Sequence, residues 1–139
     1  MKKMYPVIFT QTKDCVLVEI PDLKIFTEGK DMENAIDLAR DAISIAIVSM
    51  EDNKEEVPNA SEIFKIDVTK GSFAGEGKSF LSIVDVDIIE YRRRIDMKPV
   101  RRNVSLPGWL DYAANEAGLN VSRVLQEALM ATLGIERKY

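Results

Sequence analysis

The sequence predicts an α+β protein in two parts: an antiparallel sheet with one long helix, followed by a smaller strand–helix–helix unit. Three observations support this fold class. Short runs of alternating apolar residues open the chain, a long amphipathic segment follows them, and the sign of the charge changes near Met97. Residues 98–139 carry six basic and four acidic side chains, a net charge of +2. Because the whole chain has a net charge of −4, residues 1–97 have −6.

Composition excludes several classes of protein. Hydrophobic residues make up 46% and charged residues 30% of the 139-residue chain, a balance typical of soluble globular proteins. No apolar stretch approaches the ~20 residues that span a bilayer, and the first residues lack the apolar core of a signal peptide. We therefore expect a cytoplasmic protein without a membrane segment. Cys15 is the one cysteine and histidine is absent, so catalysis by a Ser-His-Asp or Cys-His set is excluded and an ordinary zinc site is not expected.

The first part begins with three β-like runs, Met4–Thr10, Cys15–Ile20 and residues 24–27. Turn-forming residues separate these runs, so we expect them to pair as an antiparallel meander. Asp31 is a candidate N-cap for the helix that follows. An apolar stripe along this helix, which should pack on the sheet, consists of Met32, Ala35, Ile36, Ala39 and Ile43.

The second half of this helix, residues 42–48, is apolar almost all round, with Ser44 as its one polar side chain. A helix with this pattern is usually covered on two sides. Two interpretations remain open: deep burial within its own domain, and contact with a second subunit or a partner protein.

After a polar connection over residues 51–61, alternation predicts two further strands, at residues 63–68 and 80–86. In the first of them, Phe64 should share a face with the apolar residues at 66 and 68. The loop between the strands ends in Gly-Lys-Ser, but a phosphate-binding loop would need glycine at position 72, which is serine, and would lead into a helix. We therefore predict a flexible hairpin rather than a phosphate site.

Asp85 and Asp87 alternate on the second of these strands. Two carboxylates spaced in this way are far more often surface groups than ligands of a divalent metal. No catalytic set, metal site or cofactor site emerges from the sequence, and the chain is not expected to be an enzyme.

Basic side chains are concentrated between Arg92 and Arg102, where Asp96 is the one acid. Such a local field suits a polyanion. A solvated linker is the alternative, since runs of charge are often merely exposed. The six basic residues are Arg92, Arg93, Arg94, Lys98, Arg101 and Arg102.

The second part begins with a predicted strand, residues 100–106, between two prolines. Period-two alternation places Arg101, Asn103 and Ser105 on one face, with Val100, Arg102, Val104 and Leu106 on the other. A helix should run from Gly108 to Ala117, with Trp109, Leu110 and Ala113 as inner groups, and end at Gly118. Asn120 is a candidate N-cap for a second helix from Val121 to about Gly134, whose apolar stripe contains Val121, Val124, Leu125, Ala128, Leu129 and Leu133.

About 40 residues make a small core, and the predicted strand has no partner within its own unit, so this part should dimerise. Two copies would pair their strands as a ribbon that fits a major groove. Arg101, Asn103 and Ser105 then have the chemistry of direct base readout. Asn120, Val121 and Ser122, at the start of the second helix, would contact a phosphate. The alternative is a dimerisation module whose exposed face is merely polar.

The second part resembles a ribbon-helix-helix DNA-binding domain. The resemblance lies in Val-Arg-Arg-Asn-Val-Ser-Leu-Pro-Gly-Trp-Leu from Val100 and in Gly-Leu-Asn-Val-Ser-Arg-Val-Leu from Gly118. The first part, with Tyr-Pro-Val-Ile-Phe from Tyr5 and Ile-Pro-Asp-Leu from Ile20, resembles the HicB antitoxin family, whose N-terminal domain is a degenerate RNase H-like fold. The resemblance implies a toxin-neutralising domain over residues 1–97 and a DNA-binding and dimerisation domain over residues 98–139.

This resemblance further implies a partner, a small basic HicA-type toxin that cleaves mRNA, and repression of the chain's own operon. The negative first part suits a basic toxin, and we expect Asp22, Glu28 and Glu33 to contact it. The assembly would be a homodimer on operator DNA, or a tetramer if the first part also self-associates. Two alternatives are a stand-alone ribbon-helix-helix regulator with a ligand-sensing first domain, and an active nuclease of RNase H type, which would need convergent carboxylates that the sequence does not supply.

Overall fold

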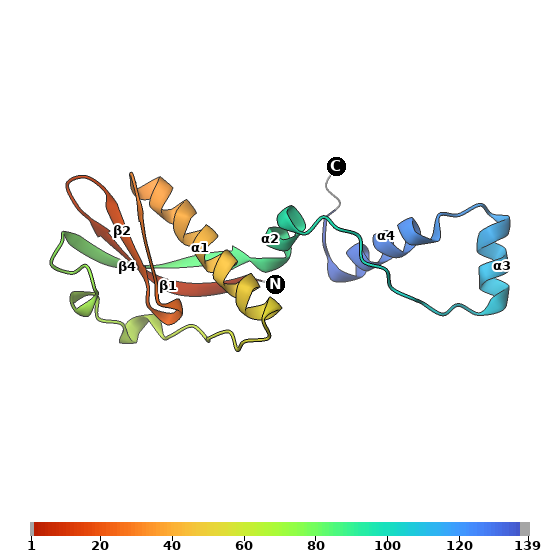
Figure 1. The fold of residues 1–139 in the computed structure, drawn as a ribbon, viewed down its shortest axis with the longest axis horizontal. Coiled ribbons are helices and arrows are strands. Elements are labelled where there is room, and N and C mark those ends of the chain that lie inside the picture. The colour runs from red at the N-terminus through yellow and green to blue at the C-terminus, as the bar shows by residue number, and fades with distance from the viewer. Residues whose placement is uncertain (1, 137–139) are drawn as a thin grey trace. The chain divides into compact units, whose positions relative to one another are not determined.

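The computed structural model describes residues 2–136 and divides into two compact units, Met1–Lys98 and Pro99–Tyr139. Figure 1 labels the α-helices of both units and most of the strands. None of the helices within residues 2–136 combines the length and the apolar character needed to cross a membrane. The strands and α-helices of the first unit are β1 (Lys2–Gln11), β2 (Val16–Ile20), β3 (Ile25–Gly29), α1 (Met32–Asp52), β4 (Lys78–Asp87) and α2 (Ile88–Ile95).

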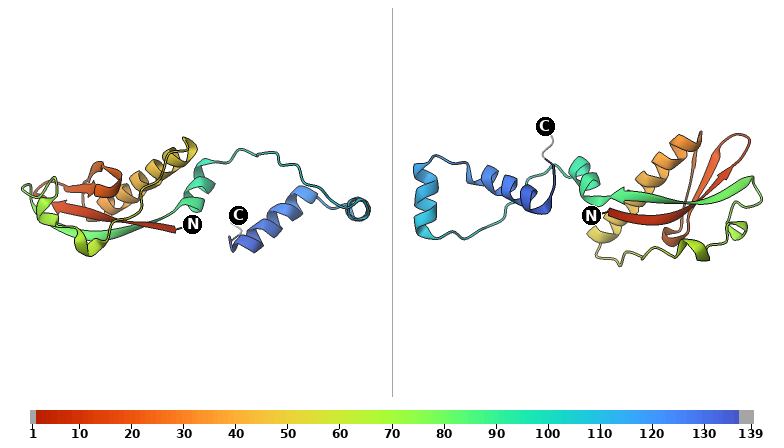
Figure 2. Two further views of the ribbon diagram at one scale, coloured as in Figure 1. Left: turned by 90° about the horizontal axis from the view of Figure 1, so that it is seen from below. Right: turned by 180° about the vertical axis from the view of Figure 1, so that it is seen from behind.

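The first unit is built on a four-stranded antiparallel sheet in the order β3-β2-β1-β4. Phe9 of β1 lies opposite Val18 of β2 and Phe80 of β4, so all three side chains point to the same face. Helix α1 packs on that face, as Figure 2 shows. The predicted strands at the start of the chain and at residues 80–86 are confirmed, because alternating apolar residues form this buried face.

The start of α1 follows the sequence prediction closely. The Asp31 side chain accepts a hydrogen bond from the backbone N–H of Asn34 at 2.8 Å, which confirms it as the N-cap. Ala35 and Ala39 are fully buried against the sheet. Gly29, at the end of β3, lies so close to the helix that a Cβ there would be 2.5 Å from the Ala35 nitrogen. Small residues on both sides therefore allow the helix to approach the strand.

The second half of α1 is buried on one side only. Ile43 and Ile47 are fully buried, and the Ser44 hydroxyl donates to the Arg40 carbonyl at 2.9 Å, which satisfies it inside the helix. Ile45, in contrast, is 53% exposed. Burial within its own domain therefore accounts for the Ile43 and Ile47 side of this stretch, whereas Ile45 lies on the side where the second interpretation, contact with a second subunit or a partner protein, stays a prediction.

The predicted strand at residues 63–68 is wrong. Two short 3-10 helices, η2 (Ile63–Lys65) and η3 (Val68–Lys70), occupy this segment. Asp67 explains the difference, because its carboxylate accepts hydrogen bonds from both the backbone N–H and the hydroxyl of Thr69. Such local bonds give the backbone an alternative to a strand ladder. With no strand before it, the loop over residues 70–79 is not a hairpin.

This loop instead covers part of the second face of the sheet, opposite α1. A Cβ at Gly71 would lie 3.4 Å from the Ile8 side chain, and Ser72 donates its N–H and its hydroxyl to the Glu19 carboxylate at 2.9 and 3.0 Å. Phe73 packs edge-on against Phe26, with 5.6 Å between the ring centroids. The loop accounts for the burial of Ile8, which points away from α1.

Helix α2 was not expected from the sequence. It follows β4 directly, and the Asp87 side chain accepts from the Glu90 backbone N–H at 3.2 Å as its N-cap. Three of the arginines in the basic run, Arg92, Arg93 and Arg94, form its last turn, where cations favour the negative end of the helix dipole.

The second unit contains α3 (Gly108–Glu116) and α4 (Val121–Leu133). Both predicted helices are confirmed, and the Asn120 side chain accepts from the Arg123 backbone N–H at 3.1 Å as the N-cap of α4. Gly118 and Gly134 follow the two helices with positive φ angles of 64° and 70°. The predicted strand at residues 100–106 is not formed in the single chain, because no second strand is present to pair with it.

The approach of Gly29 to α1 gives a stability prediction. Gly29→Ala should lower the free energy of unfolding by about 1–3 kcal/mol, because the added Cβ must displace the helix. Gly75→Ala is the matched control, since nothing lies within 4 Å of a Cβ at that position. Urea unfolding of both variants checks the prediction, and equal stability of the two would contradict the close packing.

Candidate functional site

The candidate DNA-contacting residues of the second unit lie on exposed chain. Arg101, Asn103 and Ser105 are all exposed within the extended segment that precedes α3. Val121 and Ser122 form the first turn of α4 and are also exposed. A ligand can therefore reach both the extended segment and the first turn of α4. Within the described chain no ribbon is formed that would align Arg101, Asn103 and Ser105.

The apolar side chains of the second unit are exposed as well. None of the residues in α3 or α4 is buried, and Trp109 is 72% exposed. The expectation that Trp109 and Leu110 would be inner groups is therefore wrong for the single chain. Residues 99–136 of this unit do not form a closed core, since two helices and an unpaired segment have too few surfaces to cover one another. The exposed large apolar residues are Val100, Val104, Leu106, Trp109, Leu110, Tyr112, Leu119, Val121, Val124, Leu129 and Leu133.

The predicted basic field divides between the two units. Arg92 pairs with Asp52 at 2.9 Å and with Glu51 at 3.6 Å, so it joins α2 to the end of α1. The hydrogen bond to Asp52, against a smaller opposing effect of burial, raises the pKa of Arg92 above its ordinary value. Arg93 pairs with Glu90 at 3.5 Å. Carboxylates within the first unit therefore neutralise part of the charge that the sequence assigned to a polyanion site.

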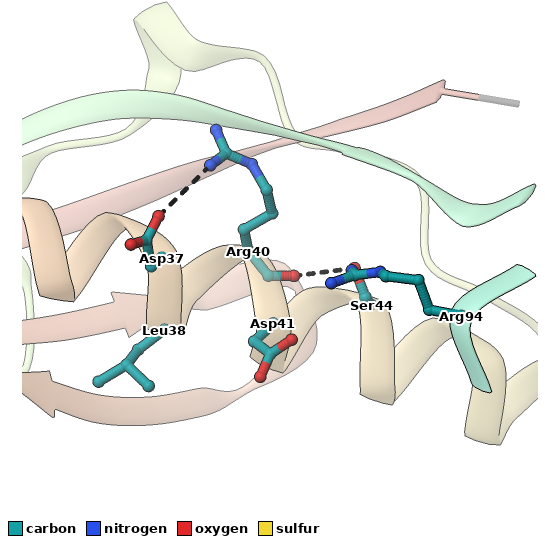
Figure 3. A pocket seen from close by; sticks show the side chains of 6 residues that line it. All are labelled: Asp37, Leu38, Arg40, Asp41, Ser44 and Arg94. Carbon is teal, nitrogen blue, oxygen red and sulfur yellow. Dashed lines mark hydrogen bonds and ion pairs between the residues drawn. The ribbon is translucent and has the colours of Figure 1, made fainter. Parts of the chain in front are cut away.

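The Arg94 guanidinium lies over the Tyr91 ring, 5.5 Å from its centroid. It also reaches a shallow pocket of about 320 Å³ between α1 and α2, which Figure 3 shows. Asp37 and Asp41 line the same pocket, and Arg40 forms an ion pair with Asp37 at 3.9 Å. Opposite charges therefore offset one another around this pocket, an arrangement that favours neither an anion nor a metal ion.

The expected toxin-contacting acids do not form one surface. Asp22 accepts hydrogen bonds from the Ser61 backbone N–H, at 2.9 Å, and from the Ser61 hydroxyl, before β3 begins. Asp22 itself lies in the 3-10 helix Pro21–Leu23, which precedes β3, whereas Glu28 lies near the end of β3. Glu33 is in the first turn of α1, near the same end as Glu28. Glu28 and Glu33 thus lie on either side of the connection from β3 to α1, whereas Asp22 precedes β3 and holds the loop that contains Ser61.

The aspartates of β4 have structural partners. Asp85 accepts from Arg40 through its carbonyl, at 3.0 Å, and through its carboxylate, at 3.4 Å. Lys2 lies 3.8 Å from the same carboxylate, and Asp87 caps α2. Within residues 2–136, no group of three or more His, Cys, Asp or Glu side chains is arranged to hold a metal ion.

Sequence reasoning missed one prominent residue. Phe64 was expected to face the same way as its apolar neighbours, but in η2 it is 98% exposed. The signal that would have found it is the Asp67–Thr69 turn motif, which breaks the alternation on which the inward placement depended.

Comparisons with known proteins identify the protein family to which this chain belongs. Residues 5–128 match the family model for the HicB-like antitoxin of bacterial toxin-antitoxin systems. This match spans most of the chain, and the protein therefore belongs to the HicB-like antitoxin family. Among curated protein sequences, none matches this chain.

Two solved structures share the fold. The first, a toxin-antitoxin complex from Streptococcus pneumoniae, is 24% identical with a TM-score of 0.60, and the match covers 95% of this chain and 99% of that one. The second, the antitoxin HicB from Burkholderia pseudomallei, is 24% identical with a TM-score of 0.51, covering 95% of this chain and 97% of that one. Both confirm the α+β class, and the ribbon-helix-helix and RNase H-like assignments remain predictions.

The division of the basic run gives a second prediction. Arg92→Ala should lower the free energy of unfolding by about 1 kcal/mol, because it leaves the Glu51 and Asp52 carboxylates without their cation. Arg94→Ala, which removes a partly exposed ring contact, should cost less. Thermal unfolding of both variants measures the difference, and a larger loss from Arg94→Ala would contradict the assigned role of Arg92.

Proposed function

We propose that this antitoxin binds and neutralises a HicA-type, mRNA-cleaving toxin and represses its own operon by sequence-specific DNA binding. The observation that supports this most is the family match over both units, which have opposite net charges of −6 for residues 1–97 and +2 for residues 98–139. A negative unit suits a basic, RNA-binding enzyme, and a positive unit suits DNA. Both targets are found in the bacterial cytoplasm, where we place the protein.

For the toxin partner, further support comes from a protein of the same fold, the Streptococcus pneumoniae chain, which is described as part of a toxin-antitoxin complex. Charge supports the same partner, because attraction between opposite charges speeds encounter and selects against wrong partners. The acids of the first unit are mostly exposed, so they remain available to a basic surface.

For DNA binding, support comes from what a second copy of the second unit would complete. Two extended segments paired as an antiparallel ribbon would satisfy backbone groups that the single chain leaves unpaired. They would also bury Val104 and Leu106 while turning Arg101, Asn103 and Ser105 outward. Arginine reads guanine and asparagine reads adenine in the major groove, so this outward face suits direct readout. The N-terminal turn of α4, at Val121 and Ser122, would hold a phosphate.

We further propose that the chain itself is not a nuclease. Metal-assisted hydrolysis of RNA needs convergent carboxylates that hold two ions. Asp85 is paired with Arg40 and Asp87 caps a helix, so neither is arranged for that role. Cleavage of RNA by the purified chain with magnesium, lost on changing Asp85 or Asp87, would contradict this proposal.

The toxin assignment predicts saturable inhibition. RNA cleavage by the product of the neighbouring small open reading frame should fall as this protein is titrated in, and should stop at a fixed ratio of the two proteins. Cleavage that continues at every ratio while operator binding is intact would favour a stand-alone regulator with a ligand-sensing first domain.

The DNA assignment predicts a difference between adjacent arginines. Arg101→Ala and Asn103→Ala should each weaken operator binding by about 1–3 kcal/mol, because each removes a contact to a base edge. Arg102→Ala, one residue along on the opposite face, should leave the preference for operator over random DNA unchanged. Fluorescence anisotropy on both DNAs measures this preference, and an equal loss on every sequence would identify phosphate contacts instead.

A further inference from the structure

Phe64 is exposed to an extent that needs an explanation. Its side chain is 98% exposed, against 54% for Phe26 and 45% for Phe80, and no other large hydrophobic side chain within residues 2–136 is as exposed. Burying such a ring stabilises a protein or a complex by about 1.5–3 kcal/mol. Because the exposed Phe64 ring makes no such contribution to the stability of the fold, it is available to stabilise a complex with a partner.

The loop that carries Phe64 is held on both sides. Before it, the Tyr5 hydroxyl donates to the Pro58 carbonyl at 2.6 Å, and Ser61 donates twice to Asp22. After it, Asp67 holds Thr69 through a backbone and a side-chain hydrogen bond. The bond from the Thr69 hydroxyl, and after it the bond from the Thr69 backbone, lowers the pKa of Asp67, so its charged, bond-accepting form persists to lower pH than that of an ordinary aspartate. A loop fixed in this way loses little conformational entropy when a partner binds.

Charge specifies the kind of partner. Residues 55–67, which we name the Phe64 loop, carry four carboxylates and one lysine. Glu55 and Glu56 are exposed at its start, and the exposed Glu62 and Asp67 precede and follow Phe64 in the chain. Glu62 forms an ion pair with Lys65 at 3.1 Å. A net charge of −3 disfavours nucleic acid and a second copy of the same loop, because like charges facing each other cost several kcal/mol. A basic protein surface is the complementary occupant.

We propose that the Phe64 loop is the surface through which this antitoxin holds its toxin, with the Phe64 ring entering an apolar pocket bordered by basic side chains. The proposal rests on the proposed function, since the toxin is the basic partner invoked there. It has the form of a binding hot spot, an aromatic anchor within a charged rim. In this proposal Asp22 does not contact the toxin, in contrast to the prediction from the sequence, but holds the Phe64 loop in place by accepting hydrogen bonds from Ser61.

The test compares the binding of full-length variants to the purified toxin encoded by the neighbouring open reading frame. Phe64→Ala should weaken the affinity about tenfold or more, measured by surface plasmon resonance. Met97→Ala is the matched control, because Met97 is also strongly exposed, at 78%, but lies outside the loop. The double change Glu55→Gln and Glu56→Gln should mainly slow association and reduce its dependence on salt.

Phe64→Ala should fold normally, since a ring that is 98% exposed contributes little to the core. Unchanged circular dichroism and an unchanged melting midpoint would verify that the variant is folded. Wild-type affinity in Phe64→Ala would overturn the proposal, as would a change in the antitoxin's own oligomeric state with toxin affinity intact. Absence of toxin binding by the wild-type chain would instead overturn the proposed function itself, so the two failures are distinguishable.

Discussion

The constraint on which the rest of this protein depends is that its second unit does not bury its own apolar side chains. Residues 99–136 form two helices joined to an extended segment, and Trp109 and Leu133 are 72% and 65% exposed. A unit of this size rarely stabilises itself without a staple or a second copy. Its helices are well capped, so the local structure is specified, but the core and the strand pairing are not complete within one chain. DNA binding, as we propose it, therefore requires association before recognition.

The first unit, in contrast, buries a hydrophobic core within a single chain. Helix α1 covers one face of the sheet, and the loop over residues 70–79 covers part of the other through Gly71 and Ser72. The Arg92 pairs attach α2 to the end of α1. Because these contacts cover the apolar core, packing does not determine which side chains lie on the surface, and that surface can carry an excess of negative charge. Folding and the proposed toxin binding thus place separate demands on this unit, and an exposed residue such as Phe64 is available for binding because it does not contribute to the core.

Local signals in the sequence predicted many of the helices, caps and strands. Features that depend on side-chain turns or on contacts between distant parts of the chain were not predicted. The caps Asp31 and Asn120 and the alternating strands were predictable because their causes lie within a few residues. Residues 63–68 were misassigned because the alternation was real but the side chain of Asp67 formed a competing turn. The role of Arg92 was not predictable, because its partners lie about 40 residues away in the chain. The candidate DNA-contacting residues followed from the sequence pattern, whereas the proposed toxin-binding surface could be chosen only from the exposure of Phe64 in the folded chain.

The most direct test of this account is hydrogen exchange at residues 100–106, measured as protein concentration is raised. If two copies pair these segments as a ribbon, backbone amides in this range should become protected together, at the concentration where the mass changes from monomer to dimer. Protection should alternate along the segment, since only some amides of an antiparallel pair face the other strand. Free exchange of these amides at every concentration, in a protein that binds its operator, would contradict the account.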